Sequence, residues 1–170
     1  MQTLRKQVLG VDVAQKELVV TLGRMTEDLA IDFYSHRVFR NNEKDFPIIM
    51  KWLKKETKED VELRIVLEAT GVYHQKFAYY MVENGFNLTV VLPNHISNYM
   101  RTLTTKTVND KTCSAAIAQF GLERNLENWT KPNQLYHDLQ QLTRERDQIV
   151  SDRSIVKNQL HAEESEAIPH

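Results

Sequence analysis

The segment at residues 7–22 constrains the fold more than any other part of the sequence. It reads as a buried strand, a tight turn at residues 14–16 and a second strand, rich in the Val and Leu that a central strand favours. One carboxylate, Asp12, interrupts this apolar run. An ionised carboxylate in such surroundings is costly unless a hydrogen-bond network, a charged partner or a metal compensates it. Asp12 therefore either satisfies the turn or is a metal ligand that needs carboxylates from elsewhere in the chain.

The bulk composition limits the partners of the chain. Its 170 residues are 41% hydrophobic, which suits one domain of ordinary size with an appendage. With 22 basic and 23 acidic residues there is no global basic field, so nucleic-acid binding would depend on local patches or metal-bridged phosphates. The absence of an apolar run near about 18 residues, and of a secretory signal, predicts a soluble cytoplasmic protein with no membrane partner. The single cysteine, Cys113, excludes an internal disulfide.

The hydrophobic patterns predict an α/β fold with a mixed five-stranded sheet flanked by helices. Three strands with short connections indicate an antiparallel meander, and the later strand–helix–strand unit indicates a parallel crossover. The expected strands cover residues 7–13, 18–25, 31–40, 62–68 and 86–92. The expected helices cover residues 44–55, 73–84 and 94–103, a segment that begins at Asn109 or Asp110, and a long segment after Pro132.

The last helix, about 30 residues long, has the repeat of a coiled coil. Its apolar seam, in alternating steps of four and three residues, is formed by Leu135, Leu139, Leu142, Ile149, Val156 and Leu160, and Arg146 and Arg153 take the remaining seam positions. A small domain cannot bury so long a stripe, so the helix predicts a homo-oligomer. We expect a domain at residues 1–128 and a coiled-coil helix with a tail at 129–170, and the ending at His170 indicates a fragment of a longer protein.

Three carboxylates can converge on one edge of the predicted sheet. Asp12 lies in the first strand and Glu68 ends the fourth, and Asp110 starts a helix that can lie against the same edge. Such a set binds Mg²⁺ or Mn²⁺, since hard cations take oxygen ligands, and two such ions support phosphodiester chemistry. The alternatives are a solvent-exposed strand end for Glu68 and a helix N-cap for Asp110.

Three segments, at residues 10–20, 67–100 and 106–121, resemble the amino-terminal half of transposases of the insertion-sequence-110 family, which includes the pilin-gene invertases. The most distinctive part is EATGVYH at residues 68–74, and the likeness spans nearly the whole chain. The resemblance implies a ribonuclease H-like domain, similar to Holliday-junction resolvases, with a D-E-D-D carboxylate set that binds Mg²⁺. It further implies cutting and rejoining of DNA in transposition, a structured guide RNA as partner, and a nucleophilic serine on a separate carboxy-terminal domain that this chain lacks.

Carried onto this sequence, the resemblance assigns catalysis and metal binding to Asp12, Glu68 and Asp110. The fourth carboxylate should follow three residues after Asp110, where this chain has Cys113. A thiol is a poor ligand for a hard cation, so the site has three carboxylates, and Cys113 reads as a small residue on the inner face of its helix. This departure keeps two other functions open: a catalytically silent module for nucleic-acid binding and dimerisation, and a stand-alone Mg²⁺-dependent nuclease that resolves junctions.

Basic residues flank the predicted carboxylate site. Arg101, Lys106 and Lys111 surround a Thr-rich connection, where they either contact phosphates or face solvent. His74, at the start of a helix, is interpreted as structural rather than as a base.

Overall fold

The computed structural model describes residues 3–69, 71–103 and 109–166. The chain divides into two compact units, Met1–Trp129 and Thr130–His170, and each is described by itself. No helix within the described residues is long and apolar enough to cross a membrane.

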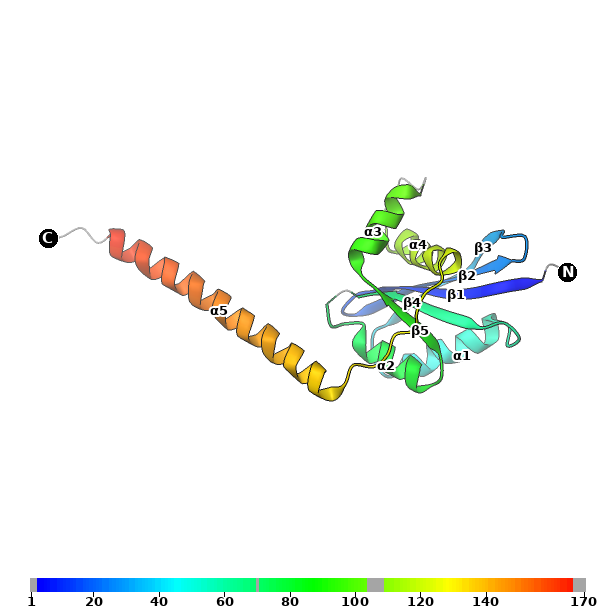
Figure 1. Ribbon diagram of the computed structural model, residues 1–170, viewed down its shortest axis with the longest axis horizontal. Helices are drawn as coiled ribbons and strands as arrows, with labels where there is room; N and C mark the ends of the chain where they lie inside the picture. Colours follow the sequence, from blue (N-terminus) through cyan, green and yellow to red (C-terminus); the bar gives the residue numbers. More distant parts are fainter. Residues whose placement is uncertain (1–2, 70, 104–108, 167–170) are drawn as a thin grey trace. The chain divides into compact units, whose positions relative to one another are not determined.

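A five-stranded mixed sheet forms the centre of the first unit, in the order β3-β2-β1-β4-β5 (Figure 1). The strands are β1 (Leu4–Val13), β2 (Glu17–Thr26), β3 (Ile31–Arg40), β4 (Leu63–Glu68) and β5 (Asn87–Val91). β1 pairs antiparallel with β2 and parallel with β4, so it lies at the centre of the sheet. The predicted mixed sheet, with an antiparallel meander followed by parallel additions, is therefore confirmed.

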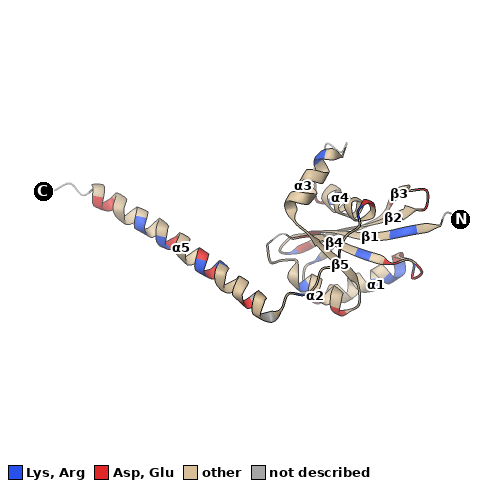
Figure 2. Cartoon of the chain, in the orientation of Figure 1, with Lys and Arg blue, Asp and Glu red and all other residues tan. Residues whose placement is uncertain are grey.

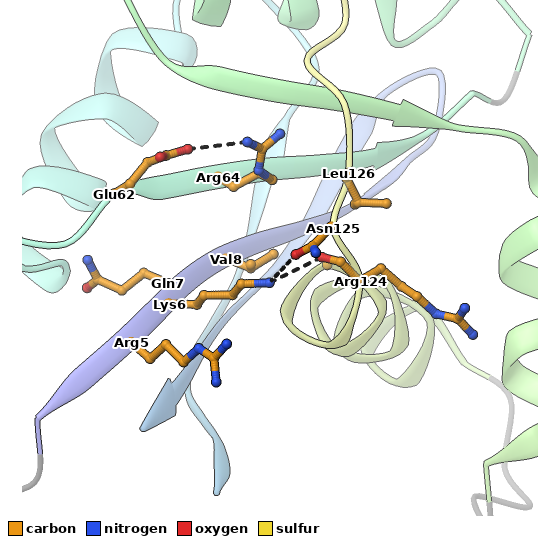
Figure 3. A pocket seen from close by; sticks show the side chains of 10 residues that line it. Arg5, Lys6, Gln7, Val8, Glu62, Arg64, Arg124, Asn125 and Leu126 are labelled. Carbon is orange, nitrogen blue, oxygen red and sulfur yellow. Dashed lines mark hydrogen bonds and ion pairs between the residues drawn. The ribbon is translucent and has the colours of Figure 1, made fainter. Parts of the chain in front are cut away.

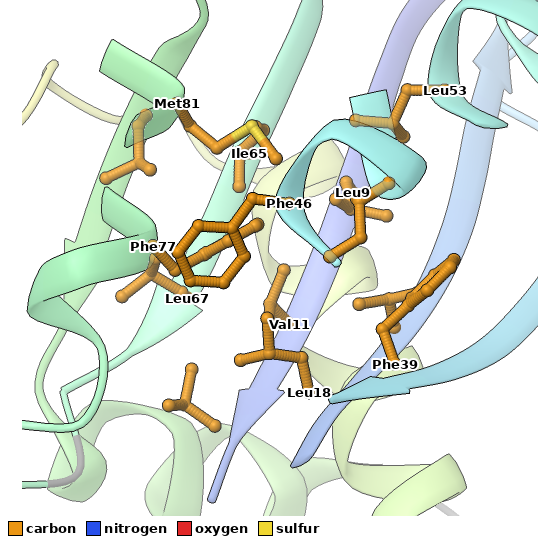
Figure 4. Packing of buried hydrophobic residues seen from close by; sticks show 14 of the residues in the cluster. Leu9, Val11, Leu18, Phe39, Phe46, Leu53, Ile65, Leu67, Phe77 and Met81 are labelled. Atoms are coloured by element: carbon orange, nitrogen blue, oxygen red, sulfur yellow. The ribbon is translucent and has the colours of Figure 1, made fainter. Parts of the chain in front are cut away.

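Helices cover both faces of this sheet. The helices α1 (Phe46–Glu56) and α2 (Gln75–Glu83) bury Phe46 and Phe77 against Leu9 and Val11 of β1 on one face (Figure 4). On the other face, α3 (Pro93–Thr102) and α4 (Asp110–Glu123) enclose a second apolar cluster that includes Val8 of β1. Because side chains alternate along a regular strand, Val8, Gly10 and Asp12 of β1 lie on the α4 face.

One detail of the sequence prediction for β3 is wrong. The alternating sequence at residues 31–40 predicts that Ile31, Phe33, Val38 and Phe39 point inward, but Phe33 and Val38 are 41% and 55% exposed, and Phe39 is the buried aromatic of this strand. The register between β2 and β3 shifts at Leu22 and Gly23, which offsets the alternation of inward and outward positions. An edge strand also has only one strand neighbour, so its faces are less completely covered.

The described residues of the second unit form one helix, α5 (Gln134–Glu166), which has 33 residues. This confirms the predicted long carboxy-terminal helix. Within the described residues of α5, the seam side chains Leu135, Leu139, Leu142, Ile149, Val156 and Leu160 are all more than half exposed. Pairing of this helix into a coiled coil stays a prediction.

Candidate active site

Asp12 and Glu68 occupy equivalent places on neighbouring parallel strands. The register of β1 and β4 pairs Gly10 with Val66 and Val11 with Leu67, so the next residues along the two strands are Asp12 and Glu68. Both residues are half-buried. Val66 belongs to the cluster on the α4 face, and Glu68, two residues later, lies on that same face with Asp12. The carboxyl ends of β1 and β4 therefore present two carboxylates beneath α4.

Gly10 determines how closely α4 approaches β1. A Cβ atom on Gly10 would lie 2.2 Å from the Ser114 carbonyl oxygen and 2.4 Å from the Ala118 nitrogen, both backbone atoms of α4. The same helix contacts the sheet through Gly121, where a Cβ would lie 2.7 Å from a methyl carbon of Val66. Only glycine permits this contact, which holds the start of α4 over the ends of β1 and β4.

Gly10→Ala should destabilise the fold by at least about 2 kcal/mol, because the added methyl group would force the backbone of α4 away from β1. Gly23→Ala is the matched control, since a Cβ there would meet only side-chain atoms, at 3.0 Å or more, and these can move. Urea unfolding of both variants measures the difference. Equal stability of Gly10→Ala and the wild type would contradict this account of the helix contact.

Asp110 is the first residue of α4, and its carboxylate is not the cap of that helix. Asn109 is the N-cap: its side chain accepts a hydrogen bond from the Thr112 backbone N–H at 2.9 Å, and its own N–H donates to Thr112 Oγ1 at 2.8 Å. Asp110 is exposed, and its charge is favourable at the positive end of the helix dipole. The capping alternative for Asp110 is therefore wrong.

The four residues singled out from the sequence share one electrostatic environment. Burial raises the pKa of the Asp12 carboxyl, and the charge of Asp110 raises it further. Burial also raises the pKa of the Cys113 thiol, with added contributions from the charges of Asp12, Glu68 and Asp110. Cys113 is thus a protonated thiol at neutral pH, neither a thiolate nucleophile nor a ready metal ligand.

The carboxylates lie near one another without forming a closed cage. Across residues 3–69, 71–103 and 109–166, no three His, Cys, Asp or Glu side chains are arranged to hold a metal ion. Burial, and after it the charge of Asp110, disfavour the ionised form of Asp12, and a bound cation would offset both effects. The carboxylate oxygens of Asp12, Glu68 and Asp110 are donors of the type and charge that a hard divalent cation prefers.

A cleft of about 560 Å³ opens beside Glu68. It lies between the end of β4 and α3, and its lining combines Ile96, Met100 and Leu103 with the exposed cation of Arg101. The sequence had singled out Arg101 for its charge but not the apolar groove around it. Lys111 is exposed on the first turn of α4, and Lys106 lies outside the described residues.

A series of side-chain hydrogen bonds, which the sequence did not predict, anchors the start of α4. Ser114 is fully buried, and its hydroxyl lies 2.7 Å from the Thr21 hydroxyl, which in turn lies 3.0 Å from Nδ1 of His36. Ser114 also donates to the Lys111 carbonyl oxygen at 3.0 Å. Burial lowers the pKa of His36, and the charge of Lys111 lowers it further. These hydrogen bonds join β3, β2 and α4 one residue after Cys113.

Two pilin gene-inverting proteins are among the proteins that this chain resembles in sequence. The chain is 24% identical over 126 residues to the pilin gene-inverting protein of Moraxella bovis and 23% identical over 126 residues to that of Moraxella lacunata. Each alignment covers 74% of this chain and 37% of the relative, so the chain spans little more than a third of their length.

A solved structure shares the fold of the first unit. The structure of Thermus thermophilus RuvC matches with a TM-score of 0.50 and 11% identity, covering 72% of this chain and 99% of that chain. This likeness confirms the ribonuclease H-like fold. The family model described as a transposase, the DEDD type of insertion sequence 110, matches residues 9–163. The chain therefore belongs to the insertion-sequence-110 family of DEDD transposases.

Proposed function

We propose that this chain is the DNA-cleaving domain of a transposase or recombinase, with Asp12, Glu68 and Asp110 as the catalytic carboxylates that bind Mg²⁺ or Mn²⁺. The observation that carries the proposal is the shared environment of these residues, which come from β1, β4 and α4: the charge of Asp110 raises the pKa of Asp12, and all three charges raise the pKa of Cys113. Membership of the transposase family supports metal-dependent cleavage of DNA as the chemistry of these carboxylates.

Each carboxylate has a distinct part in the proposed site. Asp12 is half-buried with a raised pKa, so it gains most from a cation that offsets its charge. Glu68 lines the cleft beside α3, which would receive the DNA backbone next to the scissile phosphate. Asp110 is exposed and closes the site from α4. Divalent ions bound there would supply Lewis-acid activation of the attacking oxygen and stabilise the leaving one.

The proposal extends to the whole protein of which such domains are part. We propose that excision and rejoining of a mobile element require a nucleophilic serine from a further domain and a structured guide RNA that pairs with target and donor DNA. The likeness to pilin gene-inverting proteins supports a DNA substrate. The same chemistry would make this domain dependent on its partners for a complete recombination reaction.

A second function is favoured by one observation. Cys113, a protonated thiol, stands where the family pattern implies a fourth carboxylate. A chain that had lost metal binding would remain a scaffold that binds nucleic acid and dimerises.

Metal titration separates these two functions. Calorimetry with Mg²⁺ and Mn²⁺ should detect binding to the wild-type chain, and Asp12→Asn should weaken it at least tenfold because a charged oxygen ligand is removed. Asp60→Asn is the matched control, since Asp60 is an exposed residue in the turn before β4 and carries the same charge change. No binding by the wild type would favour the silent scaffold, and unchanged binding by Asp12→Asn would contradict the assigned site.

A further inference from the structure

A second site lies at the other end of α4 from the carboxylates. A cavity of about 290 Å³ is lined by the start of β1, the start of β4 and the residues at and after the end of α4 (Figure 3). Its polar lining residues include Arg5, Lys6, Glu62, Arg64, Arg124 and Asn125. None of these residues belongs to the candidate active site.

The distance between the two sites follows from regular secondary structure. Lys6 and Asp12 are six residues apart on β1, which is about 20 Å in an extended strand. The 14 residues of α4 span about 21 Å from Asp110 to the end of the helix. The cavity is therefore separated from the carboxylates by about six base-pair steps of duplex DNA.

Positive charge dominates the cavity although the chain as a whole has a net charge of −1. Four of its lining residues are cations, Arg5, Lys6, Arg64 and Arg124, and one is a carboxylate, Glu62. Figure 2 shows basic residues on the first part of β1. This is the local basic patch that a nucleic-acid contact requires in a chain without a global basic field.

Two of these cations are held in place by the fold. Lys6 Nζ donates to the carbonyl oxygens of Leu122 and Arg124, both at 3.2 Å, and so caps the end of α4. Arg64 donates to Asn128 Oδ1 at 2.7 Å and to Thr89 Oγ1 at 3.2 Å, and pairs with Glu62 at 3.3 Å. Fixed cations bind an anion without first being ordered.

The other two cations are available to a ligand. Arg5 and Arg124 are exposed, and neither forms an ion pair within the described part of the chain. The Arg124 side chain runs away from Lys6 at the edge of the cavity, and its guanidinium lies 5.6 Å from the centre of the Phe120 ring (Figure 3). Guanidinium groups bind phosphate oxygens through two parallel hydrogen bonds.

We infer that this cavity binds the phosphodiester backbone of a nucleic acid, as an anchoring contact away from the carboxylates. The inference rests on the proposed function, because a DNA substrate at the carboxylates supplies phosphates at the required distance. Arg5 and Arg124 make the direct contacts from two sides of the cavity, along which the backbone would run, and Lys6 and Arg64 contribute fixed positive charge between them. Contacts of this kind position the nucleic acid without reading its sequence.

The test measures binding at several salt concentrations in EDTA, so that metal binding plays no part. The probes are a fluorescent 20-base-pair DNA duplex and a fluorescent RNA duplex of the same length. For DNA, Arg5→Gln combined with Arg124→Gln should reduce the slope of log K against log salt by about 1.8, because each lost phosphate contact contributes about 0.9. A reduced slope on DNA, on RNA or on both supports the cavity and identifies which backbone occupies it.

The matched control is Lys51→Gln combined with Lys54→Gln, which removes the same charge from exposed positions of α1 on the other face of the sheet. An equal loss in this control, or an unchanged slope in the cavity variant, overturns the inference, as does a wild-type chain that binds neither probe. Arg5→Gln alone, on an exposed side chain, should reduce the slope by about 0.9 with an unchanged melting temperature.

Failure of the inference is distinguishable from failure of the proposed function. The cavity variant should keep the Mg²⁺ affinity of the wild type, and Asp12→Asn should keep the wild-type salt slope in EDTA. Metal binding with an unchanged slope in the cavity variant would leave the active site standing and remove the cavity.

Discussion

Cys113→Asp is expected to increase the affinity of the chain for Mg²⁺ or Mn²⁺ at least tenfold. Cys113 lies one helical turn after Asp110, and its thiol responds to the charges of Asp12, Glu68 and Asp110, so an Asp at this position would add oxygen ligands to the same cluster. Oxygen ligands with negative charge are those that hard cations prefer. A tenfold gain corresponds to about 1.4 kcal/mol.

The same substitution should make the metal-free protein less stable. Burial and the charge of Asp110 already raise the pKa of Asp12, so a further carboxylate at position 113 adds repulsion that only a cation relieves. The melting temperature of Cys113→Asp should therefore fall below that of the wild type in EDTA and rise when Mg²⁺ is added. This opposite response to metal distinguishes a true ligand from a general change in stability.

Cys113→Asn is the control for this prediction, because it matches Asp in size and lacks the charge. Calorimetric titration and thermal unfolding with and without Mg²⁺ are measured on the wild type and both variants. If Cys113→Asp and Cys113→Asn bind Mg²⁺ equally well, residue 113 does not face the metal, and its likeness to the fourth family carboxylate is only positional.

The sheet could be predicted from the sequence because each strand is marked by the residues within it and by the turns beside it. Runs of Val, Ile and Leu bounded by turns placed all five strands, and the parallel crossover of β4 and β5 followed from the length of the segment between them. A glycine in a buried strand, here Gly10, indicates from the sequence that another segment approaches the backbone closely, and the structure shows that this segment is α4. A glycine in a strand sequence can indicate a close contact, but not which element of the fold makes that contact.

The parts that sequence reasoning missed depend on contacts between distant segments. Thr21 and Ser114 are 93 residues apart, and neither residue type signals a buried hydrogen bond by itself. The basic cavity joins Arg5 to Arg124 and Arg64, each unremarkable in its own segment. Periodicity reports which face of an element is buried and not which faces meet, so such sites appear only when the fold brings them together.

Leu142→Asp should abolish self-association of the chain if α5 forms the predicted coiled coil. Leu142 is 61% exposed, and Leu139 and Ile149, the apolar seam residues on either side of it, are 52% and 67% exposed. Most of the stability of a helix in a protein comes from packing of its apolar face, so a 33-residue helix with this exposed seam calls for a partner helix. An Asp in the seam would lose about 2 kcal/mol of burial per chain and place a charge in the interface.

We expect the dissociation constant to rise at least a hundredfold, equivalent to about 2.7 kcal/mol, in sedimentation equilibrium of the 170-residue chain. Gln140→Asp is the control, because Gln140 is exposed on α5 and lies two residues from the seam position Leu142. Its oligomeric state should match that of the wild type, whereas Leu142→Asp should be monomeric. If Leu142→Asp associates as strongly as Gln140→Asp, the heptad pattern is not an interface between copies, and the apolar seam of α5 must pack against a different partner.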